Sequence, residues 1–492
     1  MPDNDRLALK FLIPKTDNSR NLEDFRDITL FNAFIKVMFG IWSRRVNQFM
    51  VKNGFIDTGV QKGFIPKVSG CVEHNQTLHD ILRADKRGGK SVQVSFLDLK
   101  NAFGSVKHNL IVAALRWYHI PDHMISLLKR LYSDCHVIVS VNEENTTPIP
   151  IKKGSLQGGP EAGICFNIPW NIVLDGICKK AFETGSIPED KPVSGFADDL
   201  TTKTNNMEKQ QEILDHVSCL FKWSKSFTLN VKKCKSLCID STGHPIEHNL
   251  KIGGQPVSSL HNTPFKFLGR WIHPTLTDSK NLKNVTTKVE NLMKKIDVLA
   301  LDGVKKTWIY QFGFLPYIAW DLMMYQLKEA TVMELERTVN RYLKRWLGLA
   351  RCADPSIIYR NRAGLNIVNI RHYVLANRLN VEMSTATCRD PLVRTVAKRR
   401  RDEEADATGW TPTKKMKTAV EDIEFRKKFM SNIRAGGDRR GLDKAVKINL
   451  NKKTVIKRAK ELTDEEKIGK ILQLSVQSKW YEWDELINLD LK

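Results

Sequence analysis

The sequence predicts an α+β fold in which short strands form a sheet and long amphipathic helices pack beside it. Strand-like runs occur at 92–98 and at 193–204, and the second run has the form of a hairpin. Apolar residues recur at helical spacing at 31–51, 285–299 and 332–346, so the second half of the chain is mainly helical. A hydrophobic fraction of 41% and a charged fraction of 27% are typical of a globular protein, and 492 residues allow roughly two to four domains.

The charge of the chain indicates an anionic partner. There are 78 Lys and Arg residues against 55 Asp and Glu, which leaves a net charge of +23. Such a surplus favours nucleic acid, and an anionic membrane surface would also attract it. However, the longest apolar stretch, 309–327, is interrupted by Pro316 and Asp321, and the first residues are polar. We therefore expect neither a membrane partner nor secretion.

The nine cysteines follow no framework, and their odd number suits a reducing compartment. A zinc site could be drawn from Cys71 and His74 together with Cys234 and Cys238. The plainer interpretation is a set of buried thiols and loop residues, because the spacing matches no metal-binding knuckle.

The N-terminal region begins with two short strands, at 12–15 and 25–30, which are joined by a polar loop. Lys15 and Arg26 flank this loop and could contact a triphosphate, although a solvated basic loop is the commoner arrangement. A helix is expected over 31–51. A glycine-containing break at 61–66 is followed by a second helix that ends near Ala84.

Three carboxylates are the strongest sign of chemistry. Asp98 ends the strand at 92–98, before a helix expected from about Ser105 to Tyr118, and Asp198 and Asp199 lie at the tip of the hairpin. If the strand and hairpin are neighbours, the three side chains converge as ligands for divalent cations in phosphoryl transfer. A solvated turn for the doublet and a helix N-terminal acid for Asp98 are the alternatives.

A glycine-rich turn at 152–160 precedes a helix that begins near Ala162. Its glycines would allow a nucleotide or a template base to approach the backbone closely. An ordinary strand-to-helix turn is the alternative.

These residues together resemble the reverse transcriptases of LINE-type, non-LTR retrotransposons. The resemblance covers about residues 10–375. The blocks that carry it, in order, are Ile13-Pro14-Lys15, Gln61 to Pro66, Asp98 with Ala102-Phe103, Gln157 to Pro160, Phe196 to Asp199, Leu229 to Lys233, and Phe267-Leu268-Gly269.

The resemblance implies a right-hand polymerase, with an antiparallel palm sheet between fingers and a helical thumb. The metal ligands would be Asp98, Asp198, Asp199 and the backbone carbonyl of Leu99, holding two Mg²⁺ ions, with Mn²⁺ as a substitute. Asp98, Asp198 and Asp199 would be catalytic, and Lys233 would protonate the pyrophosphate leaving group, although Lys232 stands beside it.

The nucleotide would be bound by Lys15, Arg26, Phe103, Gln157 and Gly158. Lys15 and Arg26 would reach the triphosphate, and Gln157 would line the pocket. Phe103 would lie under the sugar, where a 2′-hydroxyl would clash. A core aromatic at a helix start is the other interpretation of Phe103, and the two are compatible.

The primer and duplex would be held further along the chain. Phe267 and Gly269 belong to a hairpin at 265–271 that would form the primer grip, or alternatively a simple buried strand. Arg337, Arg341 and Arg345 fall on the outer face of the helix at 332–346, where they would follow a nucleic-acid backbone. A solvated basic face is the alternative.

The expected domain boundaries follow from these assignments. We expect fingers at 1–90, palm with an interleaved fingers segment at 91–264, primer grip and thumb at 265–385, a basic linker at 386–422 and a basic helical tail at 423–492.

Basic clusters at 398–401 and 414–417 have the pattern of a bipartite nuclear-import signal or of a nucleic-acid contact. We therefore expect a nuclear location, with the cytoplasm as the alternative.

Two positions depart from the family pattern. Asp27 replaces a usual proline, and Glu161 begins a segment where Leu-Ser-Pro is common. We expect Glu161 to place a negative charge near a template or nucleotide phosphate and so to reduce activity. We find no residues that match the endonuclease or the Cys/His knuckle of related elements.

The expected function is RNA-directed DNA polymerisation, with an RNA template, a DNA or RNA primer and deoxynucleoside triphosphates as partners. One alternative is a catalytically retired element protein that serves as a nucleic-acid-binding scaffold. Another is an RNA-templated RNA polymerase, which Phe103 disfavours.

Overall fold

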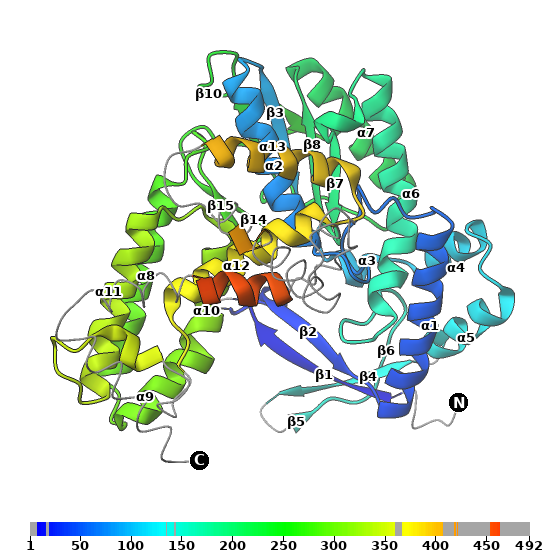
Figure 1. The fold of residues 1–492 in the computed structure, drawn as a ribbon. Coiled ribbons are helices and arrows are strands. Elements are labelled where there is room, and N and C mark those ends of the chain that lie inside the picture. Colours follow the sequence, from blue (N-terminus) through cyan, green and yellow to red (C-terminus); the bar gives the residue numbers. More distant parts are fainter. Residues whose placement is uncertain are drawn as a thin grey trace, which may run out of the picture. The chain divides into compact units, whose positions relative to one another are not determined.

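The computed structural model describes residues 7–15, 19–133, 135–141, 144–359, 367–406, 418–419, 421 and 453–462. The chain divides into two compact units (Figure 1). The first consists of Met1–Leu268 with Ile272–Leu276, and the second consists of Gly269–Trp271 with Thr277–Lys492. The predicted α+β class is confirmed, since the first unit contains two larger sheets with helices and the second is mainly helical.

The larger sheet of the first unit has the strand order β10-β9-β3-β8-β7, with β13 paired to β9. Neighbours are antiparallel except β13 with β9, and β3 is buried along its whole length. The strands are β3 (Val92–Leu97), β7 (Val193–Phe196), β8 (Asp199–Thr204), β9 (Lys235–Ile239), β10 (Pro245–Ile246) and β13 (Ser258–Ser259).

Helices cover both faces of this sheet (Figure 1). Leu78 and Leu82 of α2 (Gly70–Arg87) pack with Val94 on one face of β3. On the other face, Gln210 of α7 (Met207–Ser224) donates hydrogen bonds to Ser95 Oγ at 2.8 Å and to Thr202 Oγ1 at 2.7 Å. The long helix α6 (Ala162–Glu183) packs beside α7 and β7.

The smaller sheet has the order β2-β1-β4-β5, with β6 paired to β4. Its strands are β1 (Leu7–Pro14), β2 (Phe25–Leu30), β4 (His136–Val141), β5 (Glu144–Asn145) and β6 (Ile149–Pro150). The expected N-terminal strand pair is therefore present, and α1 (Ala33–Lys52) follows it as the apolar spacing predicts. The single-turn elements η2 (Leu22–Asp24) and η3 (Pro188–Asp190) and the helix α5 (Asp122–Ser133) complete this part of the unit.

The helix expected over 105–118 differs from the structure. A short helix α3 (Ala102–Ser105) ends before Val106, and α4 (His108–Trp117) starts a new helix. The carbonyls of Phe103 and Val106 accept hydrogen bonds from the amides of Ser155 and Gly154, at 2.9 Å and 2.7 Å. These two carbonyls are therefore hydrogen-bonded to the glycine-rich turn and are not bonded to amides of a continuous helix.

Two small hairpins stand near the end of the first unit. One joins β11 (Lys251–Ile252) to β12 (Gln255–Pro256), and the other joins β14 (Phe265–Phe267) to β15 (Arg270–Ile272). The chain passes from one unit to the other within the second hairpin.

The helical unit has its own apolar core. Its elements are α8 (Ser279–Asp297), α9 (Gly303–Ile309), the π-helical turn η4 (Tyr310–Phe314), α10 (Leu315–Met324), α11 (Glu329–Trp346), the 3-10 turn η5 (Pro355–Tyr359), α12 (Ile370–Ala386) and α13 (Pro391–Asp406). The two amphipathic helices expected at 285–299 and 332–346 correspond to α8 and α11.

Part of the expected linker is helical instead. Residues 391–406 form α13, because Val393, Val396 and Ala397 are spaced for burial on one side of a helix. Arg400 of the first basic cluster is buried and pairs with Glu382 at 3.0 Å. The second cluster, 414–417, lies outside the described residues. So does most of the expected tail, of which 453–462 are helical.

Within the described ranges, the model contains no helix whose length and apolar character would let it span a membrane.

Candidate active site

The turn that carries Asp198 is a tight hairpin. Phe196 pairs with Asp199, so Ala197 and Asp198 form a two-residue connection between β7 and β8. Ala197 has φ = +53°, in the left-handed region. Such turns favour Gly, Asn or Asp at positive φ, and an alanine there costs roughly 1 kcal/mol. The conformation therefore has to be held by its surroundings.

Asp98 lies beside this hairpin. Leu97, the last residue of β3, pairs with Leu200 of β8, so the next residues outward on the two strands are Asp98 and Asp199. The segment after Asp98 is bridged to Leu229 through the Asp98 carbonyl and the Lys100 amide. This pattern leaves the Leu99 carbonyl outside the ladder bonds. The condition set for convergence, that the strand before Asp98 lies beside the hairpin, is therefore met.

Desolvation raises the pKa values of all three carboxylates, and neighbouring carboxylates add to the effect at Asp198 and Asp199. The pKa of Asp199 rises to about 7 because protein atoms desolvate the carboxylate and because Asp198 and Asp98 are negatively charged. Burial also raises the pKa of Asp198, and Asp98 adds to the effect while Arg26 opposes it. Nearby positive charges offset only part of this burial and repulsion, so a bound cation would stabilise the ionised carboxylates.

At Asp98, burial raises the pKa, but Lys233, Lys15 and a hydrogen bond from the Asn230 side chain act against it. Two predicted site lysines therefore lie close enough to act on this carboxylate.

The donor set fits Mg²⁺. It consists only of oxygens, which Mg²⁺ and Mn²⁺ prefer. In the described ranges, no group of three or more His, Cys, Asp or Glu side chains is arranged to hold a metal ion. The predicted set includes three carboxylates, Asp98, Asp198 and Asp199, and the described residues do not gather them as a preformed metal site. Mg²⁺ is commonly held by one or two carboxylates, with water and substrate phosphates completing the shell. The alternative zinc site is not supported, since His74 bonds to the Gly195 carbonyl while Cys234 contacts the Asp98 amide.

A cavity of about 490 Å³ opens beside the carboxylates. Asp98 and Asp199 line it, and so do both Lys232 and Lys233, which are exposed. The segment 265–268 of the predicted primer grip forms another wall. Of the two neighbouring lysines, Lys233 is the one whose charge acts on Asp98.

Phe267 has a structural role in this wall. Its side chain is buried, and its ring lies 5.0 Å from that of Phe96, between centroids. The buried-strand interpretation of Phe267 is therefore correct for its side chain, and the residue also lines the cavity.

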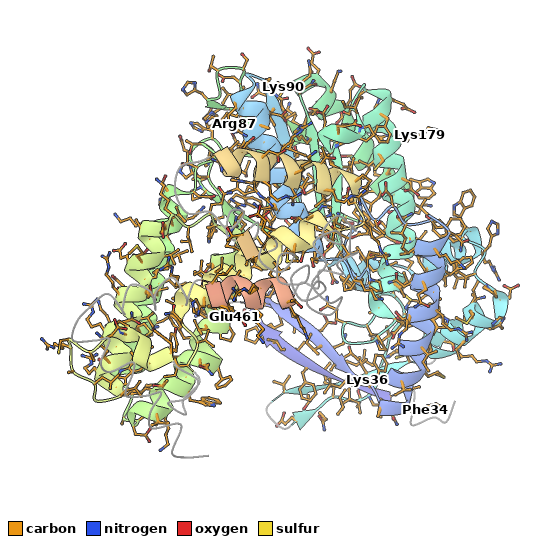
Figure 2. The ribbon with its side chains drawn as sticks, in the orientation of Figure 1. Phe34, Lys36, Arg87, Lys90, Lys179 and Glu461 are labelled. Atoms are coloured by element: carbon orange, nitrogen blue, oxygen red, sulfur yellow. The ribbon has the colours of Figure 1, made fainter. Side chains whose placement is uncertain are left out.

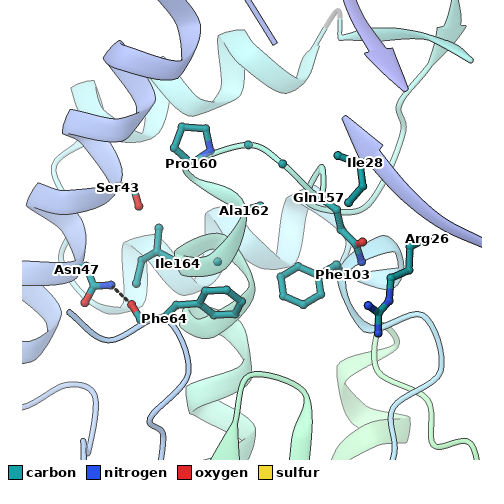
Figure 3. A pocket seen from close by; sticks show the side chains of 13 residues that line it. Arg26, Ile28, Ser43, Asn47, Phe64, Phe103, Gln157, Pro160, Ala162 and Ile164 are labelled. Atoms are coloured by element: carbon teal, nitrogen blue, oxygen red, sulfur yellow. Dashed lines mark hydrogen bonds between the residues drawn. The ribbon is translucent and has the colours of Figure 1, made fainter. Parts of the chain in front are cut away.

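A second cavity, of about 630 Å³, collects four of the five predicted nucleotide-binding residues (Figure 3). These are Arg26, Phe103, Gln157 and Gly158. The fifth, Lys15, does not line this cavity, but its charge reaches Asp98. Residues far apart in the sequence thus meet around one space, with Phe103 and Gln157 beside Arg26 (Figure 3).

The glycine-rich turn is held against β2. The Thr29 amide donates to the Gln157 carbonyl at 2.6 Å. Gly158 has φ = +109°, and a Cβ there would lie 2.3 Å from the Thr29 carbonyl oxygen. Only glycine fits this close approach.

Phe103 belongs to both a core and a cavity. Its ring stacks on Phe166, with centroids 4.6 Å apart and planes at 23°, and meets Phe64 edge-on at 5.7 Å. The same half-buried side chain lines the second cavity. Both interpretations of Phe103 are therefore compatible with its position.

The expectation for Glu161 is wrong. Its side chain is 0% exposed and accepts a hydrogen bond from the Tyr132 hydroxyl at 3.1 Å. Burial raises the pKa of Glu161 to about 7. Glu161 is the N-cap residue of α6 and its side chain is buried, so it presents no charge to a phosphate. Asp27, the other departure, pairs with Lys10 at 2.7 Å.

The remaining predicted residues belong to the helical unit and are not among the residues that line the two cavities. Gly269 has φ = +83°, and a Cβ there would lie 2.8 Å from Trp320 Nε1. Arg337, Arg341 and Arg345 are exposed at successive turns of α11. Arg345 also pairs with Asp297.

Sequence reasoning missed three side chains that hold the backbone of the site. Gln61, His74 and Asn75 are buried and bond to backbone groups at 195, 197 and 268. The motif at 61–66 pointed to the first of them. No local signal distinguished the other two from ordinary helix residues.

The chain was compared with known proteins. The family model for reverse transcriptase (RNA-dependent DNA polymerase) matches residues 13–272, more than half of the chain. Among curated proteins, the Pol polyprotein of the R2DM retrotransposable element of Drosophila melanogaster is 22% identical over 387 residues, covering 75% of this chain and 35% of that protein. An R2 polyprotein of Popillia japonica is also 22% identical, covering 76% of this chain and 53% of that protein. The chain thus spans about a third to a half of these relatives.

Among solved structures, telomerase of Candida tropicalis in complex with a TWJ fragment of telomeric RNA is 12% identical. The match covers 81% of this chain and 65% of that one, with a TM-score of 0.43. The apo telomerase of the same organism gives the same TM-score over 82% of this chain and 66% of that one. The predicted resemblance to non-LTR retrotransposon enzymes is confirmed by the R2 polyproteins, and the chain belongs to the reverse transcriptase (RNA-dependent DNA polymerase) family.

Proposed function

We propose that this chain extends the 3′ end of a DNA or RNA primer with deoxynucleotides on an RNA template. The observation that carries the proposal is the meeting of Asp98 with the Asp198-Asp199 hairpin beside a cavity that Lys233 also lines. Family membership supplies the reaction class, and this geometry supplies the groups that the reaction needs.

Asp98, Asp198 and the Leu99 carbonyl would hold two Mg²⁺ ions, with Asp199 adjacent. When bound, the ions activate the primer 3′-hydroxyl and neutralise charge on the phosphates. The protein contributes rigid placement, because both strands that carry the carboxylates are paired in the sheet.

Basic groups would bind the triphosphate and protonate the pyrophosphate leaving group. Arg26 faces the second cavity, and Lys15 acts on Asp98. Lys233 is an exposed amine at the rim of the first cavity, so its ammonium can give a proton to the departing pyrophosphate oxygen.

Phe103 would select deoxynucleotides. Its ring is fixed by Phe166 and cannot withdraw without disturbing the core, while one side remains on the cavity wall. A 2′-hydroxyl would therefore meet a rigid aromatic ring. Gln157 and Gly158 form the facing part of the same cavity.

One observation that favoured the scaffold alternative does not hold in the structure. It drew on Glu161 as a charge near the phosphates, and that carboxyl group is buried against Tyr132. Asp98 and the Asp198-Asp199 hairpin still lie on neighbouring strands. We therefore favour turnover over passive binding.

The proposal is tested by primer extension with the purified protein. A labelled DNA primer annealed to an RNA template is incubated with Mg²⁺ and the four deoxynucleotides, and product length is measured. We expect extension to the template end, and much less product when ribonucleotides replace deoxynucleotides. Tight template binding without any product would instead establish the scaffold.

We also propose a nuclear location, supported by the basic cluster at 398–401. Lys398 and Arg399 are exposed on α13, whereas Arg400 is engaged with Glu382. Imaging of a tagged protein with both exposed residues changed to alanine should show reduced nuclear signal. Unchanged accumulation would refute this role.

A further inference from the structure

The two turns that border the first cavity share an unusual backbone. Ala197, in the catalytic hairpin, has φ = +53°, and Leu268, in the β14–β15 turn, has φ = +42°. Neither is glycine, so the Cβ atom of each residue disfavours the left-handed conformation. Strained backbone of this kind persists only where neighbouring groups fix it.

A buried amide fixes the first turn. Gln61 Oε1 accepts from the Ala197 amide at 3.0 Å, and Gln61 Nε2 donates to the Ala197 carbonyl at 3.1 Å. The side chain is 1% exposed, and its Oε1 also accepts from the Gly63 amide at 2.7 Å. One side chain therefore satisfies both backbone groups of the strained residue.

A second buried amide fixes the other turn. Asn75 Nδ2 donates to the Leu268 carbonyl at 2.8 Å, and the Asn75 side chain is 1% exposed. Asn75 lies in the first turns of α2, in the same unit as Leu268. The segments 61–75 and 265–268 are thus joined directly.

His74, the neighbour of Asn75 in the sequence, contacts the catalytic hairpin. His74 Nε2 lies 2.9 Å from the Gly195 carbonyl, two residues before Ala197. Burial and the charges of Lys191 and Lys62 lower the pKa of His74, so the ring is neutral. A neutral ring that faces a carbonyl carries its proton on Nε2 and donates it.

A buried ion pair joins the loop after Gln61 to the start of α2. Lys62 Nζ lies 2.6 Å from Glu73 Oε2, and both side chains are nearly inaccessible to solvent. The Lys62 amide also donates to the Gly195 carbonyl at 3.0 Å. The loop after Gln61 and the start of α2 therefore act as one rigid piece.

We propose that Asn75 and Gln61 are positioning residues that set the primer-grip turn in register with the carboxylate hairpin. The inference rests on the proposed polymerase function, in which the primer 3′ end must lie between these two turns. Neither amide touches substrate. Their effect is transmitted through Leu268 and Ala197.

The consequence is specific to the chemical step. A misplacement of about 1 Å between reacting groups costs on the order of a hundredfold in rate. Loss of the Asn75 bond frees the Leu268 carbonyl and allows the grip turn to relax. The nucleotide cavity contains neither turn, so nucleotide binding should change little.

The test replaces Asn75 with leucine, which removes the donor and keeps the branched shape of the side chain. The matched control is Asn171→Leu. Asn171 is 2% exposed and donates to the Phe55 carbonyl at 2.7 Å, and it lines neither cavity. Both variants lose one buried side-chain donor to a distant backbone carbonyl, so both should lower the Tm.

We expect Asn75→Leu to lower kcat by about tenfold to a hundredfold, with KM for the deoxynucleotide changed less than twofold. Gln61→Leu should do the same. In Asn75→Leu, amide hydrogen exchange within 265–271 should increase, whereas Asn171→Leu should leave this segment and kcat unchanged.

Equal exchange at 265–271 in Asn75→Leu and in Asn171→Leu would overturn the proposal, whether or not the protein extends a primer. A loss that appears only in KM for the nucleotide would overturn it as well. Failure of the wild-type protein to extend any primer would count against the polymerase function, and the exchange result would still decide whether Asn75 holds the turn.

Discussion

The rings of Phe103 and Phe166 stack with their centroids 4.6 Å apart, and the Phe103 side chain also lines the second cavity. One aromatic side chain therefore connects the core of the first unit to the place where a sugar would lie. This connection gives the proposed sugar gate its stiffness, because movement of Phe103 would disturb packing behind it.

Replacement of Phe103 with valine should weaken the selection against ribonucleotides. Removing the ring leaves room for a 2′-hydroxyl, and a steric term of this size is worth about tenfold to a hundredfold in relative kcat/KM. Single-nucleotide incorporation with each deoxynucleotide and ribonucleotide pair measures the change.

Phe166→Leu is the control for that experiment, because Phe166 packs in the same stack but is not among the residues that line the cavity. It should lower stability and, because it loosens the packing that fixes the Phe103 ring, weaken sugar selection less than Phe103→Val does. If Phe103→Val keeps the wild-type sugar preference, the gate assignment is incorrect.

Lys233→Ala should reduce the rate of the chemical step more than Lys232→Ala. Both side chains are exposed at the first cavity, but the charge of Lys233 is the one that acts on Asp98. Loss of a general acid typically costs about a hundredfold or more. Single-turnover rates across pH measure the effect. Equal losses in the two variants would argue against Lys233 as the proton donor.

Glu161→Gln should stabilise the protein above neutral pH. Burial raises the pKa of Glu161 from 4.5 to about 7. The folded state therefore binds this proton more tightly than the unfolded state, and its contribution is fully present below pH 4.5 and is lost as the pH rises through 7. About 2.5 pKa units at 1.36 kcal/mol each correspond to about 3 kcal/mol.

Thermal unfolding of the wild type and of Glu161→Gln between pH 5 and 8 tests this sign. The wild type should lose stability relative to the variant as the pH increases. Tyr132→Phe should steepen the loss, because the Tyr132 hydroxyl donates to the carboxylate and lowers its pKa. Parallel stability curves for wild type and variant would show that Glu161 does not titrate in this range.

Removal of the arginine row on α11 should weaken duplex binding in a salt-dependent manner. Arg337, Arg341 and Arg345 are exposed, and each phosphate contact contributes about 0.9 to the slope of log K against log salt. The triple alanine variant should lower that slope by roughly 2 to 3. Arg345 should contribute least, since it is paired with Asp297.

The matched control removes three basic residues elsewhere, at Arg87, Lys90 and Lys179, which Figure 2 marks on α2, just after it and on α6. It lowers the net charge by the same amount. Measurements are made with an RNA–DNA duplex at several salt concentrations. An equal reduction of slope in both triple variants would mean that only overall charge matters.

Much of the fold followed from local pattern. The strand at 92–98, the hairpin at 193–204 and the helices α1, α8 and α11 were predictable because their apolar residues repeat at the period of the element. The interruption at Val106 was not, because it depends on the amides of Gly154 and Ser155, which are distant in sequence.

The candidate site was likewise predictable only where local sequence motifs determine it. The carboxylates and the glycine turn carry strong motifs, so the position of Asp98 beside the hairpin could be anticipated. The inward direction of Glu161 could not, because its partner Tyr132 lies 29 positions earlier and on another helix. The roles of His74 and Asn75 could not be predicted because their partners are backbone carbonyls. Every residue has such a carbonyl, so the residue types in the sequence do not indicate the contact.

The central claim is that Asp198 and Asp199 serve the chemical step of primer extension. The most direct measurement compares the wild type with the Asp198→Ala, Asp199→Ala double variant, using one RNA template and primer for both extension and binding. Loss of the carboxylates should reduce extension by roughly a thousandfold or more, since metal ions supply several kcal/mol at this step. Template affinity should stay nearly unchanged. Extension that persists in the double variant at a level near the wild type would contradict the account.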